Sequence, residues 1–221
     1  NKYRLPKEDP ITAPIVKEVL GPDAESVALA WRFPGLASKD FEVLQVVSQV
    51  LYNGKAGLID LDLNQQQKVL NSYGYPMGLA DYSAFILGGL PKQGQTLEEV
   101  KDLLLNEIKK LRAGEFDEKM LQANINNFKL YELQSMESNE GRADIFVNSF
   151  INGTNWEDEV TAIDRMAKLT KEDIVAFADK YLKEDNYAVV YKKQGKDPNE
   201  KKMTKPEITH IVYNRDVASP F

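Results

Sequence analysis

The sequence predicts an α+β domain in which helices cover one face of an antiparallel or mixed β-sheet, as a two-layer sandwich. Two observations lead to this fold class. Short segments in which apolar residues alternate with a period of two occur early, midway and late in the chain, and this period marks half-buried strands. Between the last two of these segments lies a long run of amphipathic stretches that begin with helix-capping signals.

The first half of the chain predicts three strands and two helices. Four prolines indicate a loop over residues 1–24, with room for a short strand at 15–20. In the next segment every second residue from Val27 to Phe33 is large and apolar, and Pro34 ends the alternation. Ser38 is placed to cap the helix that follows. The predicted elements are strands at 26–33, 69–77 and 82–90 and helices at 39–51 and 57–67.

The second half is mostly helical. Three segments place a threonine hydroxyl three residues before a carboxylate, the pattern of a capping box: Thr96-x-x-Glu99, Thr154-x-x-Glu157 and Thr170-x-x-Asp173. Helices are expected to begin at or just after residues 96, 117, 138, 154 and 170, and a last strand is expected at 187–191.

Composition excludes several classes of function. The 221 residues include no cysteine and a single histidine, His210. The chain therefore holds no thiolate zinc site, iron–sulfur cluster or cysteine nucleophile, and no two-histidine metal site. The net charge of −6 argues against nucleic-acid binding, which needs a basic face. No apolar stretch approaches the ~20 residues of a membrane-spanning helix.

No catalytic or metal-binding constellation stands out in the remaining residues. The glycine-rich run 88–94 lacks the spacing of a phosphate-binding loop. Carboxylate pairs such as Asp60 and Asp62 occur at predicted helix starts, where they favour the helix dipole. The aromatic residues of the two middle strands are mainly core material, and a tyrosine-lined groove is the alternative. We therefore predict no catalytic residue and no metal ligand in this chain.

Taken in order, several segments resemble the zinc metallopeptidases of the insulinase and pitrilysin type, also called inverzincins. The resemblance extends from about residue 24 to 193 and rests on the joint order of its parts. These parts are the strand ending at Pro34, the buried helix 41–51, the break Asn53-Gly54-Lys55-Ala56-Gly57, the tyrosine-containing strand pair, the run Gln95–Val100, the stretch 109–121 and the phrase Leu169–Val175.

The resemblance implies a metallopeptidase-like domain without catalytic activity. In such enzymes homologous α+β domains form two halves around a chamber, and only one domain carries H-x-x-E-H. This chain lacks that motif, so zinc is expected in the catalytic domain of a parent protease, and the other domains or subunits of that protease are the expected partners. We expect an excised segment with an N-terminal extended part (1–23), the inactive domain (24–193) and a lysine-rich linker toward a following domain (194–221).

The resemblance also implies where a peptide substrate would bind. The last domain of such enzymes carries an Arg and, seven residues later, a Tyr that orient substrate; Asn64 and Asn71 stand at those positions here, which favours the second domain. In some members the second domain offers a strand edge that holds the free N-terminal end of a peptide. The matching regions are 53–57 and 71–75, with Asn53, Gly54, Gly57, Tyr73, Gly74 and Tyr75 as candidate peptide-binding residues.

Two alternative functions remain open from the sequence. The chain could be a stand-alone, zinc-free binding or assembly subunit of a heteromeric processing peptidase, or an unrelated α+β enzyme domain. The sequence leaves the compartment open, a bacterial periplasmic parent being one option.

Overall fold

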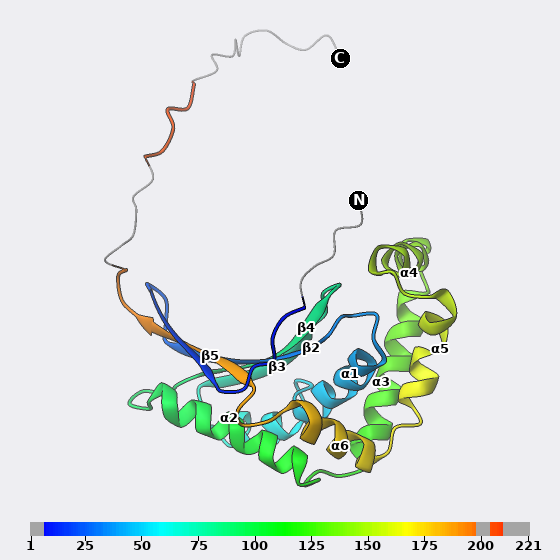
Figure 1. Ribbon diagram of the computed structural model, residues 1–221, viewed down its shortest axis with the longest axis horizontal. Coiled ribbons are helices and arrows are strands. Elements are labelled where there is room, and N and C mark those ends of the chain that lie inside the picture. The colour runs from blue at the N-terminus through cyan, green and yellow to red at the C-terminus, as the bar shows by residue number, and fades with distance from the viewer. Residues whose placement is uncertain (1–6, 198–203, 210–221) are drawn as a thin grey trace.

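The computed structural model describes residues 7–197 and 204–209 and contains one mixed five-stranded sheet (Figure 1). β1 pairs in parallel with β5, whereas β2 is antiparallel to both β5 and β4, and β3 is antiparallel to β4. The predicted mixed sheet is therefore confirmed, with β1 and β3 at its two edges. Across the sheet the strands are β1 (Ile15–Gly21), β5 (Tyr187–Gln194), β2 (Ser26–Pro34), β4 (Tyr82–Leu90) and β3 (Asn71–Met77).

Helices cover one face of this sheet, as the sequence predicts (Figure 1). Three of them pack directly on the strands, namely α1 (Lys39–Leu51), α2 (Leu97–Arg112) and α6 (Lys171–Tyr181). A short π-helix, η1 (Asp60–Asn64), lies next to β3. The remaining helices continue the helical layer beyond the sheet, in the order α3 (Lys119–Ser135), α4 (Asn139–Asn152) and α5 (Trp156–Met166). The two-layer α+β prediction is confirmed.

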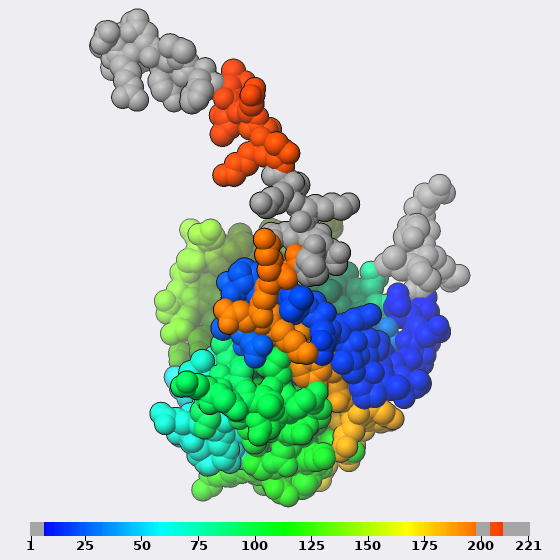
Figure 2. Space-filling view, turned by 90° about the vertical axis from the view of Figure 1, so that its left-hand side faces the viewer, coloured from blue at the N-terminus to red at the C-terminus, as the bar shows by residue number. Residues whose placement is uncertain are grey.

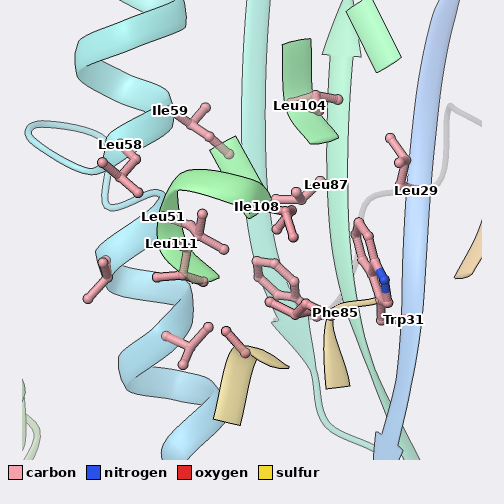
Figure 3. Packing of buried hydrophobic residues seen from close by; sticks show 14 of the residues in the cluster. Leu29, Trp31, Leu51, Leu58, Ile59, Phe85, Leu87, Leu104, Ile108 and Leu111 are labelled. Carbon is pink, nitrogen blue, oxygen red and sulfur yellow. The ribbon is translucent and has the colours of Figure 1, made fainter. Parts of the chain in front are cut away.

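The core lies between the sheet and the helices that pack on it. Along β2 every second side chain is fully buried, and Trp31 is only 1% exposed. Figure 3 shows Phe85 of β4 pointing toward Leu51 of α1 and Leu111 of α2, with Trp31 of β2 on its other side. The period-two pattern of the sequence thus becomes one apolar layer, whose removal from water is worth roughly 25 cal/mol per Å².

The first strand of the sheet lies within the N-terminal residues 1–23. All seven residues of β1 pair with β5, and Figure 2 shows the two segments side by side at the surface. β5 in turn continues past Tyr191 to Gln194, into the lysine-rich stretch. The proposed boundaries at residues 24 and 193 remain predictions. His210 and much of the expected linker lie outside the described residues.

Helix starts follow the sequence signals in most places. Thr96 and Thr170 form complete capping boxes, and the Ser38 side chain caps α1. The expected box at Thr154 is wrong. Asn155 caps α5 instead, because the Thr154 hydroxyl is directed to Ser149 on the preceding helix, 3.0 Å from its Oγ.

The segment between α1 and β4 also differs in detail from the prediction. Only Leu58 and Ile59 of the expected helix at 57–67 are α-helical, and the π-helix η1 and a turn follow. The turn places Gln67 at φ 51°, and β3 then begins at Asn71 rather than Val69. Val69 is instead buried in the core. Its apolar character, which suggested a strand, therefore reflects burial outside the sheet.

Ser83 offers a test of how buried polar groups contribute to this fold. Its hydroxyl is buried next to Phe33 and has no hydrogen-bond partner among the described residues. Because an unsatisfied buried hydroxyl costs about 1–3 kcal/mol, Ser83→Ala is expected to leave stability unchanged or raise it by about 1 kcal/mol. Urea unfolding checks this, with Ser72→Ala as the control, since the Ser72 hydroxyl bonds to Asn64 at 2.8 Å. A loss above about 1 kcal/mol for Ser83→Ala contradicts the account.

Candidate functional site

The free edge of β3 is partly closed by a side chain of η1. Asn64 Oδ1 accepts hydrogen bonds from the backbone N–H and the hydroxyl of Ser72, and its Nδ2 donates to the Ser72 carbonyl, each at 2.8 Å. The amide of Asn64 thus takes the place that a neighbouring strand would have at Ser72. Since outward-facing residues alternate along an antiparallel strand, Gly74 and Pro76 present the next backbone groups at this edge.

Of these two residues, only Gly74 can both donate and accept. Pro76 lacks an N–H group, so it presents a carbonyl alone. Gly74 packs closely on its neighbours: an added Cβ would lie 2.6 Å from Leu87 Cδ2 and 3.5 Å from Tyr52 Cβ. The part of the edge beyond Asn64 is therefore short, and Gly74 at its centre is itself buried.

A loop between α1 and η1 lies next to this edge and satisfies most of its own hydrogen bonds. The Asp60 carboxylate, only 4% exposed, accepts the backbone N–H groups of Asn53 and Gly57, both at 3.0 Å. Asn53 Oδ1 accepts those of Lys55 and Ala56. Because these backbone donors are occupied, the backbone of the loop offers a ligand mainly carbonyl oxygens, while the Asp60 carboxylate and the Lys55 ammonium group supply opposite charges beside it.

A pocket of about 340 Å³, termed the edge pocket, opens between this loop, η1 and the start of β3. Its lining consists of Tyr52, Gly54, Lys55, Asp60, Asn64, Gln65 and Asn71. The structure thus brings together Gly54 from the candidate peptide-binding set and both asparagines at the family's Arg and Tyr positions. Asn53 and Gly57 contribute indirectly by holding Asp60 in place.

The two candidate tyrosines lie elsewhere. Tyr73 and Tyr75 stack on the outer face of the sheet, with ring centroids 6.1 Å apart, and the Tyr73 ring covers Gly88. Burial, with Tyr75 adding to it, raises the pKa of Tyr73. Of the other two aromatic residues on the middle strands, Phe85 is buried in the core, and the Tyr82 ring makes a cation–π contact with the Arg32 guanidinium. The tyrosines therefore line the outer sheet face and not the edge pocket.

Sequence reasoning missed the roles of Asp60 and Tyr52. The sequence correctly predicted that Asp60 is a carboxylate at a helix start. The burial of Asp60 could not be predicted, because it depends on the loop that folds over the side chain. The sequence pattern that indicates this role of Asp60 is Gly57-x-x-Asp60. In it the carboxylate follows by three residues the backbone N–H group from which it accepts a hydrogen bond. Tyr52 carries no such signal, because its contact with Gly74 joins α1 to β3 across the fold.

A buried ionic cluster joins η1 to α2. Lys110 donates to Asp62 at 2.6 Å and to Glu107 at 2.9 Å. The hydrogen bond from Lys110 lowers the pKa of Asp62. Burial raises the pKa of Glu107, because its side chain is 1% exposed and Lys110 compensates only in part. This cluster fixes η1, and with it Asn64 and Asp60, relative to the helical layer.

The donor set does not fit a zinc ion. The chain has one histidine in all, and among residues 7–197 and 204–209 no three His, Cys, Asp or Glu side chains gather at a spacing that could hold a metal. The predicted absence of catalytic residues is not tested by this observation. Within the same described ranges no helix meets the length and hydropathy needed to cross a bilayer.

Asn64→Ala is expected to destabilise the domain by about 1–3 kcal/mol, because it leaves the Ser72 backbone groups without partners in a partly buried place. The free energy of unfolding in urea measures the loss. Gln65→Ala is the control, since it removes one exposed bond to the Lys55 carbonyl and should cost less than about 0.5 kcal/mol. Equal losses for the two variants would refute the role given to Asn64.

Glu107→Gln is expected to raise the free energy of unfolding at pH 7. The pKa of Glu107 is higher in the folded state than in the unfolded chain, so the folded state loses stability as pH rises through the ordinary glutamate range. Glutamine does not ionise, and the advantage should vanish below about pH 4. Glu98→Gln on the same helix is the control with opposite sign, because Lys101 lowers the pKa of Glu98. A stability difference between Glu107→Gln and the unaltered chain that stays the same from pH 3 to 8 would contradict this.

Comparison with solved structures shows the same fold in bacterial proteases. A protease from Helicobacter pylori matches with a TM-score of 0.79 at 21% identity, over 87% of this chain and 48% of the other. An inactive peptidase domain from Bordetella parapertussis matches with a TM-score of 0.68 at 17% identity, over 77% of this chain and 93% of the other. The periplasmic protease PqqL from Escherichia coli has a TM-score of 0.65 at 10% identity and is covered over 23% of its length, against 86% of this chain.

Sequence comparison agrees with the structural one. The zinc protease PqqE of Helicobacter pylori is 27% identical over 193 residues, which is 85% of this chain and 42% of that protein. The chain thus spans less than half of the curated relative that it matches. A family model described as the peptidase M16 inactive domain matches residues 1–128, more than half of the chain. With one histidine and no H-x-x-E-H, this chain belongs to the inactive-domain family of the M16, insulinase-like zinc peptidases.

Proposed function

We propose that this chain is the non-catalytic domain of a larger zinc metalloendopeptidase, in which it forms a wall of the peptide-binding chamber and docks on the zinc-bearing domain. The observation that carries the proposal is the match to the inactive-domain family in a chain that spans 42% of its zinc-protease relative. The zinc ion and its general base would come from the other domain. Family membership removes the alternative of an unrelated α+β enzyme.

The outer face of the sheet supports the role as a chamber wall. Helices cover the inner face only, and the outer face of the middle strands carries small or apolar side chains such as Ala28, Ala30 and Ile86. Arg32 on the same face is covered at one end by residues 8–9, through a bond to the Asp9 carbonyl. A largely apolar, weakly charged surface suits extended peptides of varied sequence, because it does not demand particular charges.

The edge of β3 supports the role in peptide binding. A peptide that displaces the side chains packed around the buried Gly74 can pair with its backbone, while Asn64 closes the edge at Ser72 and so limits the length of pairing. The edge pocket lies at this closed end and is lined by both Lys55 and Asp60, and the Asp60 carboxylate forms no ion pair within the described residues. In this proposal the free ammonium group of the peptide N-terminus enters the edge pocket and is balanced by Asp60.

The stand-alone, zinc-free subunit is the second candidate. An in-frame H-x-x-E-H domain in the same coding sequence favours the leading proposal, whereas a chain of this size encoded alone favours the subunit. A periplasmic parent is part of the proposal only, and its support is the fold that this chain shares with the periplasmic protease PqqL.

Peptide binding to this chain tests the edge pocket. We expect C-terminally labelled decapeptides with a free N-terminus to bind about tenfold more tightly than N-acetylated ones, a difference of about 1.4 kcal/mol, as measured by fluorescence anisotropy. Asp60→Asn should abolish this preference. Asp23→Asn is the matched control, since Asp23 is exposed and does not line the edge pocket, and it should keep the preference.

Two results would refute these proposals separately. Equal affinities of free and acetylated peptides for the unaltered chain would remove the role of Asp60. Zinc-dependent hydrolysis of the peptides by this chain alone would remove the non-catalytic assignment.

A further inference from the structure

The helices beyond the sheet carry an unusual density of exposed apolar side chains. We term six of them, on α4 and α5, the α4–α5 patch: Phe146, Val147, Phe150, Ile151, Trp156 and Val160. Phe150 is 88% exposed and Ile151 69%. The C-terminal half of the preceding helix α3 adds Leu130, Tyr131 and Leu133, each more than half exposed. Contiguous apolar surface of this kind marks an interaction site in a soluble domain.

The patch includes an ordered amphipathic stripe. Phe146, Val147, Phe150 and Ile151 recur at helical spacing, so they share one side of α4. Ser149 is the one buried residue of this helix. Its hydroxyl bonds to Thr154, and Phe146 stacks on Trp156 with ring centroids 4.4 Å apart. α4 is therefore held through α5 while its apolar stripe faces outward, at the end of the molecule shown in Figure 1.

The same part of the chain carries nearly all of the net charge. Residues 129–160 contain two basic and seven acidic residues, in a chain with a net charge of −6. Of the acidic residues, Asp158 forms ion pairs with Lys39 and Arg165. The others include Glu137, Glu140 and Glu157, which form no ion pair within the described ranges. The patch is thus an apolar stripe with an acidic rim.

We propose that the α4–α5 patch is the surface on which the zinc-bearing part of the same protease docks, through an apolar strip with a basic rim. This inference rests on the proposed function and adds the surface and the chemistry of the partner. The two Helicobacter pylori relatives are about twice as long as this chain, so the proposed parent protease has room for a partner of similar size. An acidic rim selects a basic counterpart, since opposite charges across an interface favour association.

Charge also argues against a second copy of this chain as the occupant. In a symmetric dimer the same patch lies on both sides, so the acidic rims would face each other. Like charges brought together across an interface disfavour the complex. A peptide substrate is a poorer fit, because the patch lies on helices and offers no strand edge for pairing.

Hydrogen exchange followed by mass spectrometry tests the proposal. The protein expressed from the complete coding region is compared with the 221-residue chain, and amides of α4 are expected to exchange at least tenfold more slowly in the complete protein. Phe150→Gln with Ile151→Gln should remove this protection. The control, Val16→Gln with Leu79→Gln, alters exposed apolar side chains outside the patch and should retain it.

Each outcome separates this inference from the function on which it rests. Equal exchange of α4 in the two proteins, when the complete protein hydrolyses peptides with zinc, overturns the docking surface and leaves the function intact. A complete protein without a zinc-bearing domain overturns the proposed function itself. Protection of α4 that grows with the concentration of the 221-residue chain assigns the patch to a second copy and overturns the proposal.

Discussion

Strand β2 runs through the middle of the sheet with large apolar side chains on one face and small ones on the other. This asymmetry constrains the rest of the fold, because a shift of one residue would move Trp31 and its neighbours to the opposite face. α1, α2 and α6 all pack on the face that β2 makes apolar. The opposite face is left without a helical cover.

Polar contacts position the candidate site within this frame. The ion pairs of Lys110 fix η1 on α2, and η1 in turn places Asn64 against the β3 edge and Asp60 beneath the preceding loop. A buried charge is tolerated only when it is paired or hydrogen-bonded. The shape of the edge pocket thus depends on these polar contacts.

Local signals predicted the fold better than the site. The capping residues Ser38, Thr96 and Thr170 were correct because capping involves residues only three apart. The box at Thr154 failed because the end of the preceding helix, through Ser149, competed for the hydroxyl. The spacing of apolar residues in α4 predicted a helix, but this spacing alone does not determine whether Phe150 packs on another element or is exposed to solvent.

The sequence by itself determined the α+β class, the order of the main elements and the lack of a zinc motif, since each depends on composition or on spacing along the chain. The tertiary structure alone decided that Asn64 closes the β3 edge at Ser72, that Asp60 is buried beside a pocket and that the stripe of α4 is uncovered. The physical reason is that these properties depend on what surrounds a residue in space, and those neighbours come from segments that the fold brings together.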